Sequence, residues 1–256
     1  MKTRLVLNNL GFNDDLKIWQ DKNSFNYSVD TILLANFISL SRKVKNALEI
    51  GTNNGALAIL VAHRKSDLKI DALEINAKAL EIAKKNLEIN KKSPQINLIA
   101  GDFNQFWPDL NKKQAQKYDL IFANPPYFKV DTKIIKKVNK EFQNAIYEFC
   151  LNLQQLIFGC AKIIQQKGKL ALVLPIERFV DLVQLLRENR FEPKKVQFVM
   201  TRVGSTPKFV LVEAQFNAPW GTNYLHNLYL HPKNKNSHEY RKEIQRLYVV
   251  KKVKND

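Results

Sequence analysis

The most chemically specific segment is Ile121-Phe122-Ala123-Asn124-Pro125-Pro126-Tyr127, an apolar run that ends in an amide, two prolines and a tyrosine. Successive prolines end a strand ladder because proline has no N–H donor. We therefore expect the Asn124 side-chain oxygen and the Pro125 carbonyl to form two hydrogen-bond acceptors, with Pro126 fixing the turn and the Tyr127 ring beside them. Such a group fits a planar exocyclic NH₂ on a heterocycle. The segment thus predicts catalysis at an amino nitrogen. The alternative is that it only ends the strand and has no catalytic role.

A second segment runs from an apolar strand into a glycine turn that opens a helix, Leu48–Ala56. Gly51 and Gly55 permit positive φ and a close backbone approach, and Asn53, which replaces a glycine of the dinucleotide fingerprint, tolerates positive φ. Glu49 is an acid inside this apolar strand, which costs stability unless it has a partner. A ligand ammonium, or a backbone amide in the facing loop, would supply that partner.

The next two predicted strands also end in acids. Glu74 lies nineteen residues after Gly55, where a carboxylate can accept both hydroxyls of a ribose, with Ile75 directly after it. Asp102 follows the third strand and can accept from an adenine amino group, with Phe103 beside the ring. A simple Gly-Asp turn is the alternative for Asp102. Together with the glycine turn, these residues predict a nucleoside-binding site.

The elements that position these residues follow from periodicity. From Lys45 onward, short β-type runs alternate with amphipathic helical ones, which is typical of a doubly wound α/β sheet. We expect a seven-stranded Rossmann-like sheet, mostly parallel with an antiparallel C-terminal hairpin strand, and a short N-terminal β-hairpin at 3–7 and 16–20. Asp30 is expected to cap the helix that runs through Ile38. The expected strands are 46–50, 69–75, 96–100, 118–123, 169–174, 195–203 and 209–216, and the expected helices are 56–64, 77–90, 147–166 and 176–189, with a short mixed stretch after Ala100.

One domain is the simplest organisation for 256 residues without repeats or linkers. We divide it into the N-terminal hairpin and helix (1–44), the cofactor-binding core (45–216) and a basic C-terminal extension (217–256). Two cysteines, Cys150 and Cys160, form no metal-ligand spacing with the four histidines, so no metal is expected. No apolar stretch reaches the ~18 residues of a membrane helix and no secretory signal is evident, which predicts a cytoplasmic protein without membrane contact.

The chain carries 41 basic and 24 acidic residues, a formal charge of +17. AT-rich coding, which favours lysine, can produce part of this excess without any partner. The placement argues for a polyanion nonetheless, because clustered charge marks phosphate binding. The predicted phosphate contacts of this polyanion are Lys129, Lys133, Lys136, Lys137, Lys140 and Arg202, together with the basic extension.

These motifs resemble those of class I S-adenosylmethionine-dependent methyltransferases that act on amino nitrogens. Glu49–Gly55 is similar to their first motif, Glu74 to their ribose acid, Asp102 to their adenine acceptor and Asn124–Tyr127 to their catalytic motif. The resemblance covers roughly residues 20 to 216.

Within that class, residues 16–21 and 25–35 are similar to the N-terminal segment of the bacterial tRNA1(Val) adenine-37 N6-methyltransferase family. In that family the segment packs beside the methionine end of the cofactor, which implies Tyr27 and Asp30 as further cofactor contacts. Residues 145–148 are similar to the segment after the catalytic loop, but the arginine expected before it has no evident counterpart, and Lys137 or Lys140 is the expected substitute.

The resemblance implies methyl transfer from S-adenosylmethionine to N6 of adenine 37 in tRNA1(Val), by a monomer or weak homodimer. The target base must leave its stack, and Tyr127 would receive it. One alternative is N5-glutamine methylation of a release factor, which uses the same Asn-Pro-Pro-Tyr motif but needs a helical N-terminal domain. Others are N6-adenine methylation of rRNA or DNA, and a cofactor-free RNA-binding module with a Rossmann-like shell.

Overall fold

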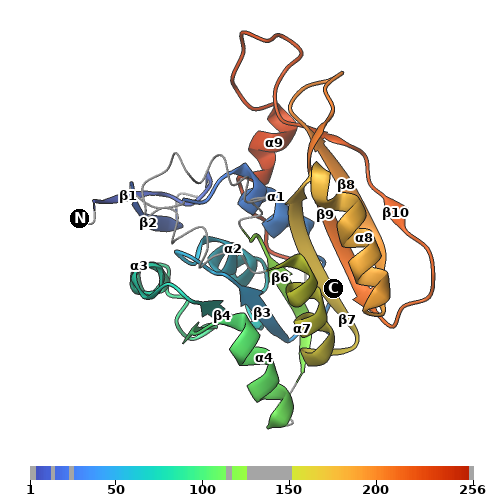
Figure 1. The fold of residues 1–256 in the computed structure, drawn as a ribbon. Coiled ribbons are helices and arrows are strands. Elements are labelled where there is room, and N and C mark those ends of the chain that lie inside the picture. Colours follow the sequence, from blue (N-terminus) through green and yellow to red (C-terminus); the bar gives the residue numbers. More distant parts are fainter. Residues whose placement is uncertain (1–3, 13–14, 23–25, 114–116, 126–151, 254–256) are drawn as a thin grey trace, which may run out of the picture.

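The computed structural model describes residues 4–12, 15–22, 26–113, 117–125 and 152–253. Its main feature is a twisted sheet with helices on both faces (Figure 1). Seven long strands follow one another across this sheet in the order β8-β9-β7-β6-β3-β4-β5. Their bounds are β3 Asn46–Ile50, β4 Lys69–Glu74, β5 Ile96–Ala100, β6 Tyr118–Ala123, β7 Ile164–Pro175, β8 Phe191–Met200 and β9 Pro207–Phe216.

Neighbouring strands from β5 to β7 run parallel, whereas β9 is antiparallel to both β7 and β8. The predicted doubly wound sheet with an antiparallel C-terminal hairpin strand is therefore confirmed. Two short strands, β10 (Asn223–Tyr224) and β11 (Leu228–Tyr229), pair with β8 and extend the sheet at that edge. The N-terminal hairpin is also present, with β1 (Leu5–Asn9) antiparallel to β2 (Lys17–Asp21).

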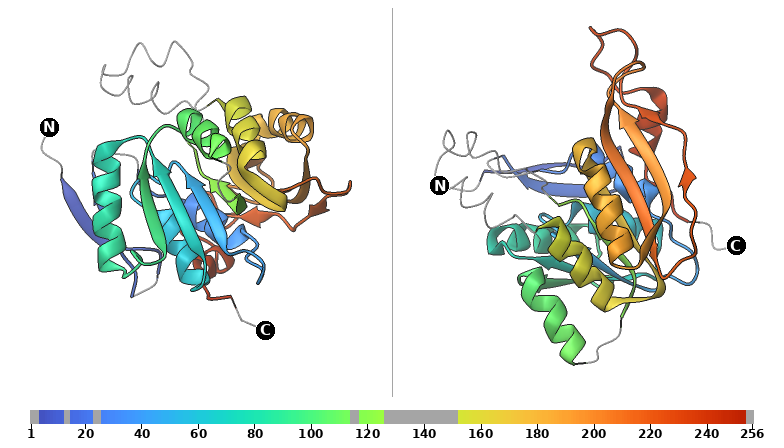
Figure 2. Two further views of the ribbon diagram at one scale, coloured as in Figure 1. Left: turned by 90° about the horizontal axis from the view of Figure 1, so that it is seen from below. Right: turned by 45° about the vertical axis from the view of Figure 1, so that its right-hand side comes forward.

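Two apolar cores lie on opposite faces of the sheet, and alternate strand residues such as Ala47 and Leu48 enter different cores. Burial on both faces explains the nearly continuous apolar runs of these strands. One core packs against α1 (Val29–Phe37) and α2 (Ala56–Arg64), with Leu87 of α3 (Ala77–Ile89). The other packs against α4, α7 and α8, whose separate layer is visible in Figure 2. Their bounds are α4 Phe103–Lys112, α7 Leu153–Ile163 and α8 Phe179–Glu188, the last preceded by the 3₁₀ turn Ile176–Arg178.

Two element predictions were wrong, and two expected bounds also differ: β8 is Phe191–Met200 rather than 195–203, and α7 ends at Ile163 rather than at 166. The stretch after Ala100 is the helix α4, although Pro108 lies inside it. Proline removes one helical N–H donor, but Phe106, Trp107 and Leu110 pack on the α7 core and hold the helix in place. The strand β7 begins at Ile164 rather than Lys169, because a register shift lets Ile164 pair with Tyr118 before Lys169 pairs with Leu120.

The predicted cap of α1 was also wrong. Ser28 occupies the N-cap position, and Asp30 lies in the first turn. The Asp30 carboxylate accepts from the Ser28 hydroxyl and from the Thr31 N–H (2.8 Å), so it acts on the same helix end from within the helix. An acid in the first turn also suits the positive end of the helix dipole.

The C-terminal extension wraps back onto this helix. After β11 it forms α9 (Lys242–Leu247), whose Ile244 is fully buried in the α1 core. Asn36 of α1 donates its Nδ2 to the Leu247 carbonyl (2.8 Å). At the carboxyl end of α1, Arg64 donates to the Ala35 and Ile38 carbonyls, and Lys195 donates to the Phe37 carbonyl. Helix α1 is therefore fixed along its length by distant segments.

No helix within the described ranges is long and apolar enough to cross a membrane. Across the same part of the chain, no group of three or more His, Cys, Asp or Glu side chains could hold a metal ion.

Candidate active site

The parallel register places the predicted site residues at one edge of the sheet. Glu49 of β3 lies opposite Ala72 of β4 and Phe122 of β6, and Glu74 lies opposite Ala100 of β5. The segments that follow these strands therefore emerge side by side at their carboxyl ends. In open α/β sheets this is the edge where ligands bind.

The glycine turn has the backbone that the sequence predicts. Gly51, Asn53 and Gly55 have φ values of 74°, 51° and 82°. A Cβ built on Gly51 would meet no atom within 4 Å, so the backbone there borders open space. The turn is fixed to the neighbouring strand β4, since the Gly51 and Thr52 N–H groups donate to the Leu73 carbonyl at 2.9 and 3.0 Å. A ligand can thus approach the main chain of the turn directly.

Glu74 joins the end of β4 to this turn. One carboxylate oxygen accepts from the Asn53 N–H (2.7 Å) and the other from the Asn76 N–H (2.8 Å). Burial raises the pKa of Glu74, and backbone hydrogen bonds from Asn76, Asn53 and also Ile75 partly offset that rise. Because a carboxylate offers about four acceptor positions, about one remains for a ligand hydroxyl.

Glu49 is 2% exposed and its partner is the Thr52 hydroxyl, which donates to Oε2. The sequence interpretation left a ligand ammonium or a backbone amide as the partner, and the Ala58 N–H adds such an amide. Burial raises the pKa of Glu49 to about 8, against the lowering effect of Thr52, and the nearby Glu74 charge adds to the rise. A cation placed beside Glu49 would favour the ionised form.

Asp102 and Phe103 begin α4. Asp102 is the N-cap of that helix, and its Oδ1 accepts from the Asn104 N–H (2.9 Å). Phe103 is buried against Gly159 of α7, where an added Cβ would come within 2.6 Å of the Phe103 ring. Ile75, by contrast, is 46% exposed and directly follows Glu74. The adenine contacts predicted for these residues stay predictions.

Asn124 is half-buried and Pro125 is buried. The Asn124 Nδ2 donates to the Thr31 hydroxyl at 3.2 Å, and Thr31 is 5% exposed on α1. This contact turns the amide nitrogen toward α1 and leaves the amide oxygen available as an acceptor. Pro126, Tyr127 and the predicted RNA contacts Lys129, Lys133, Lys136, Lys137 and Lys140 lie outside the described residues.

We expect Thr31→Val to lower kcat of the methyl transfer that the sequence predicts by roughly fivefold, since a lost hydrogen bond of ~1 kcal/mol frees the amide to rotate. KM for the methyl donor should change less than kcat, and Thr31→Ser should restore the rate. Thr222→Val is the matched control, because its hydroxyl donates to the Pro193 carbonyl (2.8 Å) near the β8 edge. Steady-state kinetics test this, and equal rates for the Ser and Val variants would contradict it.

Tyr27 and Asp30 hold the segment that carries Thr31. The Tyr27 hydroxyl donates to the Asn9 carbonyl (3.0 Å) and accepts from the Gly11 N–H (3.3 Å). These bonds tie the hairpin to the start of α1. Contact of Tyr27 and Asp30 with a cofactor stays a prediction.

Asn86 of α3 is a positioning residue that the sequence reasoning missed. Its amide exchanges hydrogen bonds with the backbone of Trp19 in β2, at 2.6 and 3.0 Å, and also donates to the Asn54 carbonyl in the glycine turn (2.8 Å). Asn90 pairs with the Lys17 backbone in the same way one helical turn later. Asn54 Nδ2 is buried without a hydrogen-bond partner in the described part of the chain. The spacing of four residues between two asparagines on α3 was the available signal.

Arg202 is engaged within the chain. Its guanidinium donates to the carbonyls of Pro232 (2.8 Å), Ser237 (2.9 Å) and Lys235 (3.3 Å) and so holds the loop between β11 and α9. Its contact with RNA stays a prediction.

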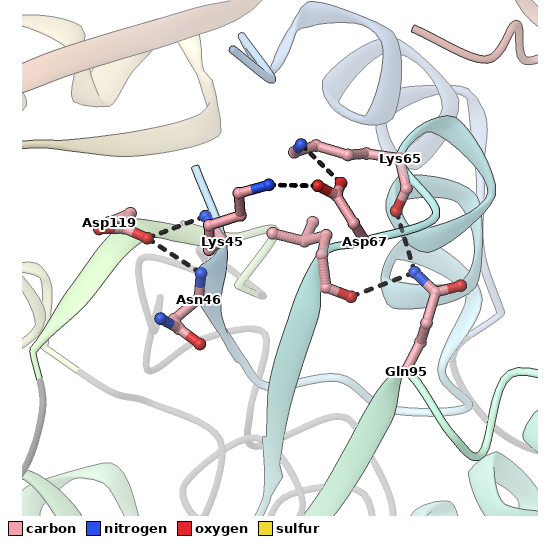
Figure 3. Close-up of polar contacts among 7 residues, drawn as sticks. Lys45, Asn46, Lys65, Asp67, Gln95 and Asp119 are labelled. Carbon is pink, nitrogen blue, oxygen red and sulfur yellow. Dashed lines mark hydrogen bonds and ion pairs between the residues drawn. The ribbon is translucent and has the colours of Figure 1, made fainter. Parts of the chain in front are cut away.

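A cavity of about 360 Å³ lies at the opposite end of the strands, beside Asn46, Asp71 and Tyr118. The polar groups there serve the fold (Figure 3). Asp119 accepts from the Lys45 and Asn46 N–H groups, and Gln95 donates to the Lys65 and Leu68 carbonyls. Lys45 and Lys65 lower the pKa of Asp67 to about 2 by hydrogen bonding. The predicted site residues Glu49, Glu74 and Asn124 lie instead at the carboxyl edge of the sheet.

Residues 18–199 match the model of the methyltransferase small domain family. The chain is similar to the tRNA1(Val) (adenine(37)-N6)-methyltransferase of Parabacteroides distasonis, with 30% identity over 77% of this chain and 79% of that protein. The enzyme of the same name from Tolumonas auensis is 31% identical over 75% of this chain and 77% of its own. A solved structure described as a predicted O-methyltransferase from Agrobacterium tumefaciens has a TM-score of 0.67 and 17% identity, covering 88% of this chain and 98% of that one. That likeness concerns the fold alone.

Proposed function

The chain belongs to the methyltransferase small domain family, and from that premise we propose that it transfers a methyl group from S-adenosylmethionine to N6 of an adenine in tRNA. The observation that carries the proposal is the Asn124 amide at the carboxyl edge of the sheet. Its nitrogen donates to Thr31, so its oxygen is the group left to accept from a substrate. The glycine turn and the two buried glutamates lie at the same edge.

The residues present fit S-adenosylmethionine, which supplies an electrophilic methyl group on a positively charged sulfur. The open space above Gly51 admits a ligand to the backbone of the turn. The buried Glu49 suits an ammonium group, and the unpartnered Asn54 amide suits a carboxylate. The proposed cofactor residues are Tyr27, Asp30, Glu49, Gly51, Asn53, Gly55, Glu74, Ile75, Asp102, Phe103 and Asn124.

The proposed chemistry depends on positioning. The lone pair of an adenine N6 is delocalised into the ring, so the nitrogen is a weak nucleophile. Acceptance of its two N–H bonds by Asn124 Oδ1 and the Pro125 carbonyl favours a pyramidal nitrogen with a directed lone pair. Pro126 and Tyr127 are proposed to complete this site, with Tyr127 stacking on the flipped base. No base is needed before transfer, because the nitrogen becomes acidic only after methylation.

The names of the similar enzymes support adenine 37 of tRNA1(Val) as the acceptor. The charge of +17 suits an RNA substrate, and the lysines at 129–140 are proposed to bind its phosphates. We treat residues 1–256 as one catalytic unit that acts on tRNA in the cytoplasm. N5-glutamine methylation is the second candidate, because an amide nitrogen also has two N–H bonds to offer.

Methylation with labelled S-adenosylmethionine separates these candidates. The purified protein is incubated with bulk tRNA, with a bacterial release factor or with both, and the label is counted in RNA and in protein. We expect the label in tRNA in both mixtures that contain it. Label that enters the release factor instead would replace the proposed function by the glutamine reaction.

A further inference from the structure

Four aromatic side chains stack in a continuous row that joins the two ends of the chain. Phe12 stacks on Tyr248 with a centroid distance of 4.7 Å and an interplanar angle of 25°. Tyr248 stacks on Tyr240 (5.5 Å, 30°), and Tyr240 stacks on His231 (5.1 Å, 14°). We call these four residues the aromatic ladder. Its small interplanar angles give it a flat, stacked geometry rather than the edge-to-face packing of most core aromatics.

The ladder is held rigidly at its Phe12 end. The Phe12 N–H donates to the Tyr248 carbonyl (2.9 Å), which fixes the hairpin turn against the extension. The preceding Gly11 N–H donates to the Tyr27 hydroxyl. Phe12 is nevertheless 53% exposed, although burying this ring would stabilise the fold. A ring that is stacked on one side and open to solvent on the other can stack with a second planar group on its open face.

The ladder is connected to the candidate active site through helix α1. Tyr27, Tyr240 and Tyr248 pack against the same core as the apolar residues of α1. Tyr27 precedes Thr31 in the sequence, and Thr31 contacts Asn124. Asn36 further joins the same helix, α1, to the segment before Tyr248 through the Leu247 carbonyl. Figure 1 shows α9 directly above α1, with the hairpin reaching α1 from the left.

The surroundings of the ladder are basic. The described part of the extension, residues 217–253, carries seven Lys or Arg residues and two acids, a net charge of 7 − 2 = +5. Lys242 and Arg246 are exposed on α9, directly between Tyr240 and Tyr248 in the sequence. Single-stranded nucleic acids bind surfaces that combine stacked aromatic rings with cations for the phosphates.

We propose that the exposed face of Phe12 is a stacking platform for an unpaired base of the RNA substrate, next to the adenine that enters the active site. This inference rests on the proposed function and adds a residue of the N-terminal hairpin to the RNA-binding surface. The ladder supports Phe12 from behind, and Lys242 and Arg246 bind the phosphates on either side. The platform selects unpaired over paired RNA, because a base inside a duplex has no free face.

Fluorescence anisotropy with two labelled RNA probes tests the platform. One probe is a stem–loop with an unpaired loop, and the other is a fully paired duplex of the same length. Phe12→Ala should weaken binding of the stem–loop roughly tenfold and change binding of the duplex less than about twofold. Phe12→Tyr should bind both probes like the wild type, and Phe12→Leu should resemble Phe12→Ala, because leucine keeps apolar area without a ring.

Trp220 provides a matched control, since it is 85% exposed and precedes β10, on the other side of the molecule from the hairpin (Figure 1). Trp220→Ala should leave both affinities unchanged. Unchanged stem–loop affinity in Phe12→Ala, or an equal loss for both probes, would overturn the platform. So would a Phe12→Leu variant that binds like the wild type. Thermal melts and calorimetry with S-adenosylmethionine check that each variant is folded and binds the cofactor.

The labelling of bulk tRNA by the wild-type protein distinguishes a failure of the proposed methyltransferase function from a failure of the Phe12 platform. If tRNA is methylated and Phe12→Ala binds the stem–loop normally, only the platform fails. If no RNA is labelled, the proposed function fails, and the anisotropy data then report on RNA binding alone.

Discussion

Asn124→Ala is expected to lower kcat for methyl transfer about 100-fold or more, while Kd for S-adenosylmethionine stays within about twofold, because Asn124 is only one of the eleven proposed cofactor residues. The substitution removes the amide oxygen that we propose accepts from the target amino group, and a single positioned polar group of this kind contributes roughly 10²–10³ to a rate. The substitution also removes the hydrogen bond to Thr31. That hydrogen bond involves neither the glycine turn nor Glu74, which are bonded to each other separately. Single-turnover kinetics and calorimetry measure the two quantities separately.

Asn97→Ala is the control for this experiment. Its amide donates to Asp71 (2.9 Å) beside the cavity at the opposite end of the strands, so both rate and cofactor affinity should stay near the wild-type values. An Asn124→Ala variant that loses cofactor affinity and rate by the same factor would show that Asn124 serves the cofactor and not the transfer step.

We expect the stability of the wild-type protein to fall between pH 4.5 and 8, and we expect Glu49→Gln to remove most of this fall. Burial raises the pKa of Glu49 from its usual 4.5 to about 8, so in this range the folded protein binds a proton that the unfolded chain has released. Stability is therefore full below pH 4.5 and falls as the pH rises toward 8. At 1.36 kcal/mol per pKa unit the loss is on the order of 4 kcal/mol.

Urea unfolding at pH 5 and pH 8 measures this effect, taken as the difference between wild type and variant so that other titrating groups cancel. The exposed Glu81→Gln on α3 is the control and should retain the wild-type dependence. The Glu49→Gln variant should be more stable than the wild type at pH 8. Wild-type and Glu49→Gln stabilities that change equally with pH would contradict the burial of a protonated Glu49.

The sheet and the edge that carries the site could be predicted because they depend on local patterns. Alternating strand and helix periods determine a parallel sheet, and a parallel sheet brings Glu49, Glu74 and Asn124 to one edge whatever the exact register. The positive φ of Asn53 also followed from residue type alone.

The supporting contacts could not be predicted in the same way. Thr31 and Asn124 are 93 residues apart, and Asn86 and Trp19 are 67 apart, so no local pattern pairs them. Helix α4 was missed because Pro108 disfavours a helix locally. The apolar side chains of α4 pack on the core beneath α7, and this tertiary packing stabilises the helix. From the sequence, Arg202 could be recognised only as a positive charge. Its hydrogen bonds to three carbonyls of the loop after β11 depend on the tertiary structure.

The most direct test of the central hypothesis is mass spectrometry of nucleosides from tRNA incubated with the wild-type protein and labelled S-adenosylmethionine, with Asn124→Ala as the inactive control. We predict labelled N6-methyladenosine in the wild-type reaction, confined to one valine isoacceptor and to the adenine next to its anticodon. Label in a nucleoside other than N6-methyladenosine, or no label in RNA at all, would contradict the assignment of this chain as a tRNA adenine N6-methyltransferase.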